Sequence, residues 1–142
     1  MRVFLGGTCN NSNWRDILIP MLDVEYFNPV VADWTPADQQ REISEREQCD
    51  IVLYVITPLM LGVYSIAEVV DDSNKRPSKT MLCILNADDS FRKIWTSSQM
   101  KSLEAVKDLV RKNGATVTST LDQTARVINM AAATTKPSSA KW

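Results

Sequence analysis

One carboxylate, Glu68, stands out among the residues that could do chemistry. It lies shortly after a strand-like apolar run, in the first turn of an expected helix, where the partial positive charge of the helix N-terminus favours an acidic side chain. Its neighbours Ile66, Ala67 and Val69 are apolar, so we expect its side chain to be largely buried. A buried carboxylate needs a partner or a function, and nucleophilic attack and proton transfer are the functions open to it.

Two further segments could contact a ligand. Gly6-Gly7-Thr8 follows the first strand-like run, where glycines let the backbone approach a ligand, although a tight strand-to-helix turn has the same pattern. This segment matches neither of the glycine-rich phosphate-binding fingerprints. Asp33 could hydrogen-bond a base or a sugar, and Trp34 could either stack on a base or simply cover the edge of the core.

The amino-acid composition limits the kinds of catalytic and binding site that the chain can form. The 142 residues include no histidine, which excludes Ser–His and Cys–His nucleophile pairs and histidine-bound metals. Three widely spaced cysteines indicate neither a disulfide framework nor a zinc site, so we expect a cytoplasmic protein without metal or cofactor. A net charge of −1 without a basic stripe gives no reason to expect nucleic-acid binding. No apolar run approaches the roughly 20 residues that span a bilayer, and the early Gly6 argues against a signal peptide.

Strands and helices are expected to alternate along the chain. Strands are predicted over 2–5, 25–28, 51–56, 80–85 and 115–118, and helices over 14–22, 36–48, 66–72, 95–112 and 121–132. Pro20 should bend the first helix, and Ser65 should cap the third. The second helix is expected to present a mostly solvated face formed by Glu42, Glu45, Arg46 and Glu47. Asp88-Asp89 is expected to form a solvated turn.

This alternation predicts one α/β domain over 1–132, with a flexible tail over 133–142. Five parallel strands with helices on both faces favour a doubly wound, flavodoxin-like sheet of order 2-1-3-4-5. Ligands bind such sheets beyond the carboxyl ends of the strands. Here the segments at those ends are 6–11, 57–65 and 86–89, so we expect the site at the carboxyl ends of the strands.

Several segments together resemble the nucleoside 2-deoxyribosyltransferase-like family. They are Val3-Phe4-Leu5-Gly6-Gly7-Thr8, Tyr26-Phe27-Asn28-Pro29, Cys49-Asp50-Ile51 through Thr57-Pro58, and Gly62-Val63-Tyr64-Ser65-Ile66-Ala67-Glu68. The resemblance covers roughly residues 2 to 130 in element order and is most specific from Asp50 to Glu68. The small branch that opens with Gly-Gly-Thr-Cys-Asn-Asn-Ser-Asn-Trp-Arg is the most similar part of the family.

The resemblance implies a function and a set of site residues. Glu68 would attack the anomeric carbon of a deoxynucleoside and form a covalent deoxyribosyl-enzyme, which a second base or water then resolves. Tyr64 and Ser65 would orient Glu68. The implied substrate-binding residues are Gly6, Gly7, Thr8, Asn28, Asp33, Trp34, Thr57, Gly62 and Asn86. A neighbouring subunit completes the site in relatives, so the resemblance also implies a homo-oligomer.

The chain also departs from the family pattern. The small-residue segment that usually follows the nucleophile is replaced by Val69-Val70-Asp71-Asp72, and the first loop, Thr8-Cys9-Asn10-Asn11, lacks the arginine of related monophosphate hydrolases. Without a cationic anchor for a 5′-phosphate, the sequence favours a nucleoside or another uncharged glycoside. Two alternatives stay open: a non-catalytic nucleotide-binding module, and an NAD-cleaving glycohydrolase, for which no arginine near the site is apparent.

Overall fold

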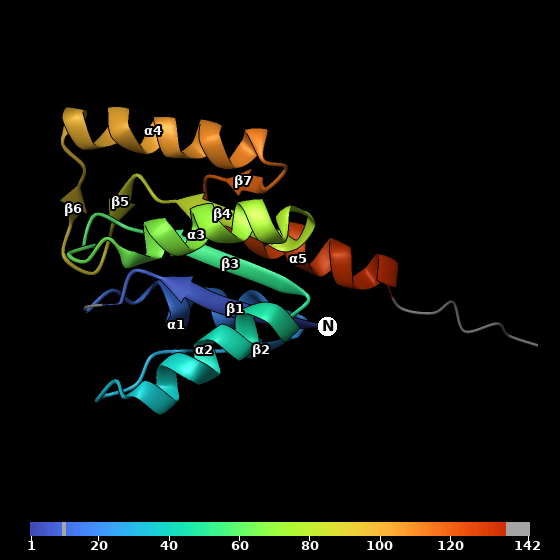
Figure 1. Ribbon diagram of the computed structural model, residues 1–142. Coiled ribbons are helices and arrows are strands. Elements are labelled where there is room, and N and C mark those ends of the chain that lie inside the picture. The colour runs from blue at the N-terminus through green and yellow to red at the C-terminus, as the bar shows by residue number, and fades with distance from the viewer. Residues whose placement is uncertain (10, 136–142) are drawn as a thin grey trace, which may run out of the picture.

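The computed structural model describes residues 1–9 and 11–135 and confirms the α/β architecture around one parallel sheet (Figure 1). Its strands are β1 (Arg2–Gly7), β2 (Glu25–Phe27), β3 (Ile51–Ile56), β4 (Thr80–Ile84) and β7 (Thr116–Thr118). They pair in parallel in the order β2-β1-β3-β4-β7, which is the expected flavodoxin-like order. The carboxyl ends of β1, β3 and β4 therefore lie at one edge of the sheet.

Helices cover both faces of the sheet. They are α1 (Trp14–Leu18), α2 (Pro36–Gln48), α3 (Tyr64–Lys75), α4 (Ser97–Lys112) and α5 (Leu121–Thr135). Apolar residues of α1 and α5 pack on one face in a single core cluster, and those of α3 and α4 pack on the other. Helix α2 lies on the α3 side, since its Arg46 contacts Asp72 of α3. Every residue of β3 and β4 is buried, because layers on both sides exclude water from these strands.

Several helix boundaries differ from the sequence-based prediction, including the start of α4, which is Ser97 and not Trp95. The first helix ends at Leu18 and continues as a 3₁₀ turn, η1 (Ile19–Met21), because Pro20 cannot donate the backbone hydrogen bond that a longer α-helix needs. Helix α3 begins at Tyr64 after Val63, so Ser65 lies inside the helix and is not its cap. A second 3₁₀ turn, η2 (Pro77–Lys79), leads from α3 into β4.

The segment after β4 forms a small hairpin that the sequence did not predict. Strands β5 (Ala87–Asp88) and β6 (Lys93–Ile94) pair antiparallel beside the main sheet. The predicted solvated turn is wrong for Asp88, which is buried and accepts hydrogen bonds from Ser12 Oγ at 2.6 Å and from the Ser90 amide at 3.0 Å. Helix α5 runs on to Thr135, past the expected end at Ala132, and the rest of the predicted tail lies outside the described residues.

Candidate functional site

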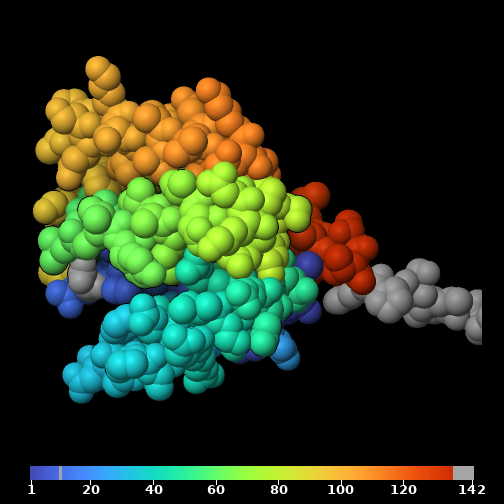
Figure 2. All heavy atoms as spheres, viewed as in Figure 1, coloured from blue at the N-terminus to red at the C-terminus, as the bar shows by residue number. Residues whose placement is uncertain are grey.

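A cavity of about 290 Å³ lies between α2 and α3, beside the carboxyl end of β1. Figure 2 shows this face hollowed between the two helices, and blue atoms from the N-terminal part of the chain lie at the base of the hollow. The lining residues are Phe4, Gly6, Gly7, Cys9, Arg15, Pro29, Val30, Val31, Trp34, Glu42, Tyr64, Ser65 and Glu68. The cavity thus joins the first loop, the segment between β2 and α2, and the start of α3.

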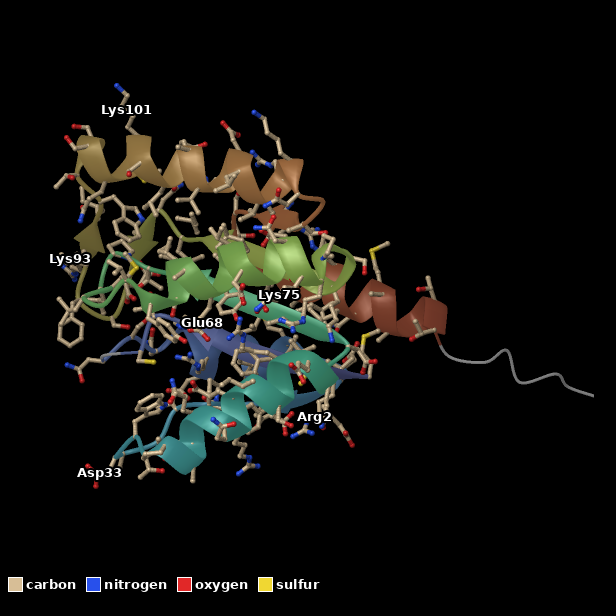
Figure 3. The ribbon with its side chains drawn as sticks, in the orientation of Figure 1. Arg2, Asp33, Glu68, Lys75, Lys93 and Lys101 are labelled. Atoms are coloured by element: carbon tan, nitrogen blue, oxygen red, sulfur yellow. The ribbon has the colours of Figure 1, made fainter. Side chains whose placement is uncertain are left out.

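Glu68 enters the cavity from α3 on the side that faces α2 (Figure 3). Its side chain is 11% exposed, and its Oε2 lies 3.6 Å from Nη1 of Arg46. Because α3 begins at Tyr64, Glu68 lies beyond the first turn, and the expected first-turn placement is wrong. Burial raises the pKa of Glu68 to about 7, while the positive charge of Arg46 lowers it and the charge of Glu42 raises it further. Near neutral pH this carboxyl group can therefore exist in either protonation state.

A second carboxylate, Glu42, lines the same cavity from α2. Burial raises its pKa, while a hydrogen bond with Trp34 and the charge of Arg46 lower it. The predicted solvated face of α2 is therefore wrong: Glu42 is half-buried, and Glu45 and Arg46 are buried. Glu45 pairs with Arg2 of β1, and Arg46 pairs with Asp72 of α3. Because these partners lie on other elements, the local sequence pattern does not reveal that the two charges are buried.

The floor of the cavity at the end of β1 requires glycine. A Cβ on Gly6 would lie 2.7 Å from the ring of Tyr54, and a Cβ on Gly7 would lie 2.0 Å from the Val55 carbonyl oxygen. Gly7 also has a φ of +119°, which other residues rarely adopt. Both glycines thus allow β1 to lie close to β3 just where the cavity opens.

Arg15 is a cavity residue that the sequence reasoning missed. It is buried, and its guanidinium donates from Nε and Nη2 to the Leu5 carbonyl at 3.1 and 3.0 Å, and from Nη1 to the Thr8 carbonyl at 2.8 Å. The expectation that no arginine lies near the site is therefore wrong, since Arg15 lines the cavity. Its position at the start of the helix that follows the glycine loop was the available signal. Its hydrogen bonds to carbonyls hold the loop in place around the cavity.

Comparison with protein-family models gives one match that decides the family. The model described as "Nucleoside 2-deoxyribosyltransferase like" matches residues 1–86, which is more than half of the 142-residue chain. The chain belongs to the nucleoside 2-deoxyribosyltransferase-like family. The matched segment runs from β1 through β4 and contains every residue that lines the cavity. A search of curated proteins gives no match. Membership supports a nucleoside-related glycosyl-transfer activity at the level of the family.

Tyr64 and Ser65, the residues expected to orient Glu68, form no side-chain hydrogen bond with it among the described residues. Tyr64 and Ser65 both line the cavity, yet Tyr64 is 59% exposed. Among the described residues, Glu68 forms an ion pair with Arg46, which comes from α2. Thr8 and Gly62 line a smaller adjoining cavity of about 150 Å³, which shares Gly7, Cys9, Tyr64 and Ser65 with the first.

Four other predicted binding residues lie outside these two cavities. Thr57 is buried and its amide donates to Thr8 Oγ1 at 2.9 Å, so it braces the first loop. Asn28 accepts from the Val30 amide through its Oδ1 at 3.1 Å, and this bond shapes the cavity wall. Asp33 is exposed and lies well away from Glu68 (Figure 3). Asn86 lines a separate cavity of about 350 Å³ together with residues of α1 and the start of α5.

Within residues 1–9 and 11–135, no group of three or more His, Cys, Asp or Glu side chains is placed to hold a metal ion. In the same part of the chain, no helix has the length and apolar character needed to cross a membrane.

Proposed function

We propose that this protein cleaves the N-glycosidic bond of nucleosides or deoxynucleosides through a covalent intermediate on Glu68. The observation that carries the proposal is the Glu68 carboxylate at an open cavity, with a cation on one side and a second carboxyl group on the other. In a member of this family, that arrangement suits attack on an anomeric carbon. Tyr64 and Ser65, at the cavity wall, would position the sugar against Glu68.

The two carboxyl groups would divide the chemistry between them. An oxygen of ionised Glu68 forms a bond to C1′ while the C1′–N bond breaks, and the electron pair of that bond goes to the leaving base. Glu42, which lines the same cavity, would donate a proton to the departing nitrogen. A second base or a water then attacks C1′, returns its proton to Glu42 and frees Glu68.

The rest of the cavity suits a nucleoside. Gly6 and Gly7 leave room for the sugar above the sheet edge, and the half-exposed Trp34 offers a flat apolar face for the base. The Arg15 guanidinium is held by the carbonyls of the first loop, so a 5′-phosphate would have to compete with those bonds. We therefore expect nucleosides to be better substrates than their monophosphates.

The test is release of free base, measured by chromatography with mass detection, from deoxynucleosides, ribonucleosides, monophosphates and NAD. We expect the wild type to release base from at least one nucleoside, and Glu68→Ala and Glu68→Gln to be slower by roughly a thousandfold or more, since an amide or a methyl group cannot attack C1′. Glu47→Gln, a change at an exposed glutamate of α2, is the matched control and should keep wild-type turnover.

Other outcomes would support a different function for this protein. Cleavage of NAD alone would favour the glycohydrolase alternative, and binding of nucleosides without cleavage by the wild type would favour a non-catalytic module. Addition of a second free base separates transfer from hydrolysis, because only transfer yields a new nucleoside.

A further inference from the structure

The side chain that faces Glu68 from α2 is itself held in a buried cluster. Arg46 Nε donates to Asp72 Oδ2 at 3.0 Å, and its Nη2 donates to Asp72 Oδ1 at 2.9 Å. Asp72 is fully buried and also accepts from Tyr54 Oη at 2.5 Å and from Arg76. A two-point contact between a guanidinium and a buried carboxylate fixes both position and orientation. Arg46 therefore has little freedom to move.

The geometry of this contact leaves one edge of Arg46 for Glu68. Nε and Nη2 donate to Asp72, and Nη2 also donates to Asp71 Oδ2 at 3.2 Å. Nη1 lies 3.6 Å from Glu68 Oε2. Glu68 and Asp72 are four residues apart on α3, so both carboxylates lie on the helix face that meets α2. A separation of 3.6 Å is longer than a hydrogen bond, so Arg46 attracts the carboxylate without engaging its lone pairs. The oxygen that must attack C1′ stays free to do so.

We propose that Arg46 is a positioning residue of this site, clamped by Asp72 and Tyr54 so that its charge holds Glu68 at the cavity wall. The inference rests on the proposed function for its purpose, but its geometry and its test do not need a substrate. Asp72 has a second effect: when Glu68 becomes a neutral ester in the intermediate, Arg46 still has a carboxylate partner and the buried charge stays compensated.

The other charged groups near Glu68 set the sign of each expected effect. Arg46 favours its ionised form, whereas Glu42 from α2 and Asp71 and Asp72 from α3 oppose it. Burial and the Asp72 charge raise the pKa of Tyr54 of β3 well above its ordinary value, so Tyr54 remains a neutral donor. Removal of Arg46 should therefore make Glu68 harder to ionise, and removal of the Asp72 charge should make it easier.

The experiment follows the ionisation of Glu68 directly. The protein is labelled with ¹³C at glutamate carboxyl carbons, the Glu68 signal is assigned by its loss in Glu68→Gln, and its titration is followed by NMR. In Arg46→Gln we expect the midpoint to rise by about one pH unit, because a cation at this distance is removed. In Asp72→Asn we expect it to fall, because a like charge is lost and Arg46 is released toward Glu68. Arg111→Gln is the control, since Arg111 pairs with Asp108 on the exposed side of α4 and should leave the midpoint unchanged.

The two variants keep the inference falsifiable even if one fails to fold. Amide spectra establish which variants are folded, and a folded Arg46→Gln or Asp72→Asn whose Glu68 midpoint equals that of the wild type would overturn the positioning role. Where a substrate is known, the acid limb of kcat/KM should shift with the NMR midpoint, and kcat should fall more than KM rises. Opposite midpoint shifts in a protein that cleaves no nucleoside would support the positioning role while contradicting the proposed function.

Discussion

At the scale of single residues, the site is defined by carboxyl groups whose surroundings differ. Glu68 and Glu42 line one cavity, and burial raises the pKa of both. Arg46 lies at 3.6 Å from Glu68, whereas Glu42 has a hydrogen bond with the neutral indole of Trp34. In the proposed mechanism these two carboxyl groups act as nucleophile and acid, in a chain that has no histidine.

The raised pKa of Glu68 predicts a pH dependence of folding stability. The folded chain, with a pKa of about 7, binds this proton more tightly than the unfolded chain, whose value is near 4.5. Between these two values stability therefore falls as the pH rises. We expect Glu68→Gln, which cannot ionise, to keep about 1–2 kcal/mol of unfolding free energy that the wild type loses across this range. Urea unfolding at the two ends of the range measures the difference, and identical pH profiles for wild type and variant would contradict it.

At the scale of elements, the structure shows which patterns predict correctly. The continuous apolar runs of β3 and β4 indicated buried parallel strands, and both strands lie where expected apart from one residue at the end of β4. The bounds of α2 were also correct, because Pro36 follows Thr35, whose side chain forms a capping box with Asp38. The strands β5 and β6 have two residues each, too few to show any periodicity, and so were missed.

The candidate site was predictable only in part. Gly6 and Gly7 end β1, and Glu68 lies in the helix that follows β3, so their place at this end of the sheet follows from topology. Arg15, Glu42 and Arg46 are charged residues on helices, and sequence patterns place such residues in water. What buries them is contact between elements far apart in the chain, such as Arg46 with Asp72, and no local pattern reports such contacts.

The end of β1 yields a prediction with a built-in control. Gly7→Ala would place a Cβ against the Val55 carbonyl and force alanine into a φ of +119°, so we expect a loss of about 2–4 kcal/mol in unfolding free energy. Gly62→Ala adds a Cβ with no atom within 4 Å and should change stability little. Equal denaturant midpoints for the two variants would show that β1 does not need a glycine at this position.

At the scale of the whole molecule, an apolar groove lies open on the described part of the chain. A groove of about 820 Å³ runs between α3 and α4, lined largely by apolar side chains that include Val63, Ile66, Val70 and Val106. Val63 is 70% exposed and directly precedes the helix that carries Glu68. Because the groove and the cavity share α3, a second copy of the chain seated on the groove would stiffen the wall that holds the nucleophile. We therefore expect the homo-oligomer that the family resemblance implies to form through this groove.

Sedimentation of paired variants tests this assembly. Ser102 is exposed and lines the groove, so Ser102→Glu should place a charge in the contact and yield monomers at micromolar concentration. Ala105→Glu changes an exposed residue of the same helix that does not line the groove, and it should sediment as the wild type does. A wild type that is strictly monomeric, or a Ser102→Glu variant that assembles normally, would argue against this interface.

The claim that Glu68 becomes covalently linked to a sugar is central to the whole account, and the mass of its peptide tests that claim most directly. The wild type is incubated with a 2′-fluoro-substituted deoxynucleoside, whose fluorine slows breakdown of the intermediate, and is then digested and analysed by mass spectrometry. We expect the peptide containing Glu68 to gain the mass of one fluorinated sugar, and the same peptide from Glu68→Gln to gain none. A sugar found on another residue, or a nucleoside that is cleaved as fast by Glu68→Gln as by the wild type, would contradict the account.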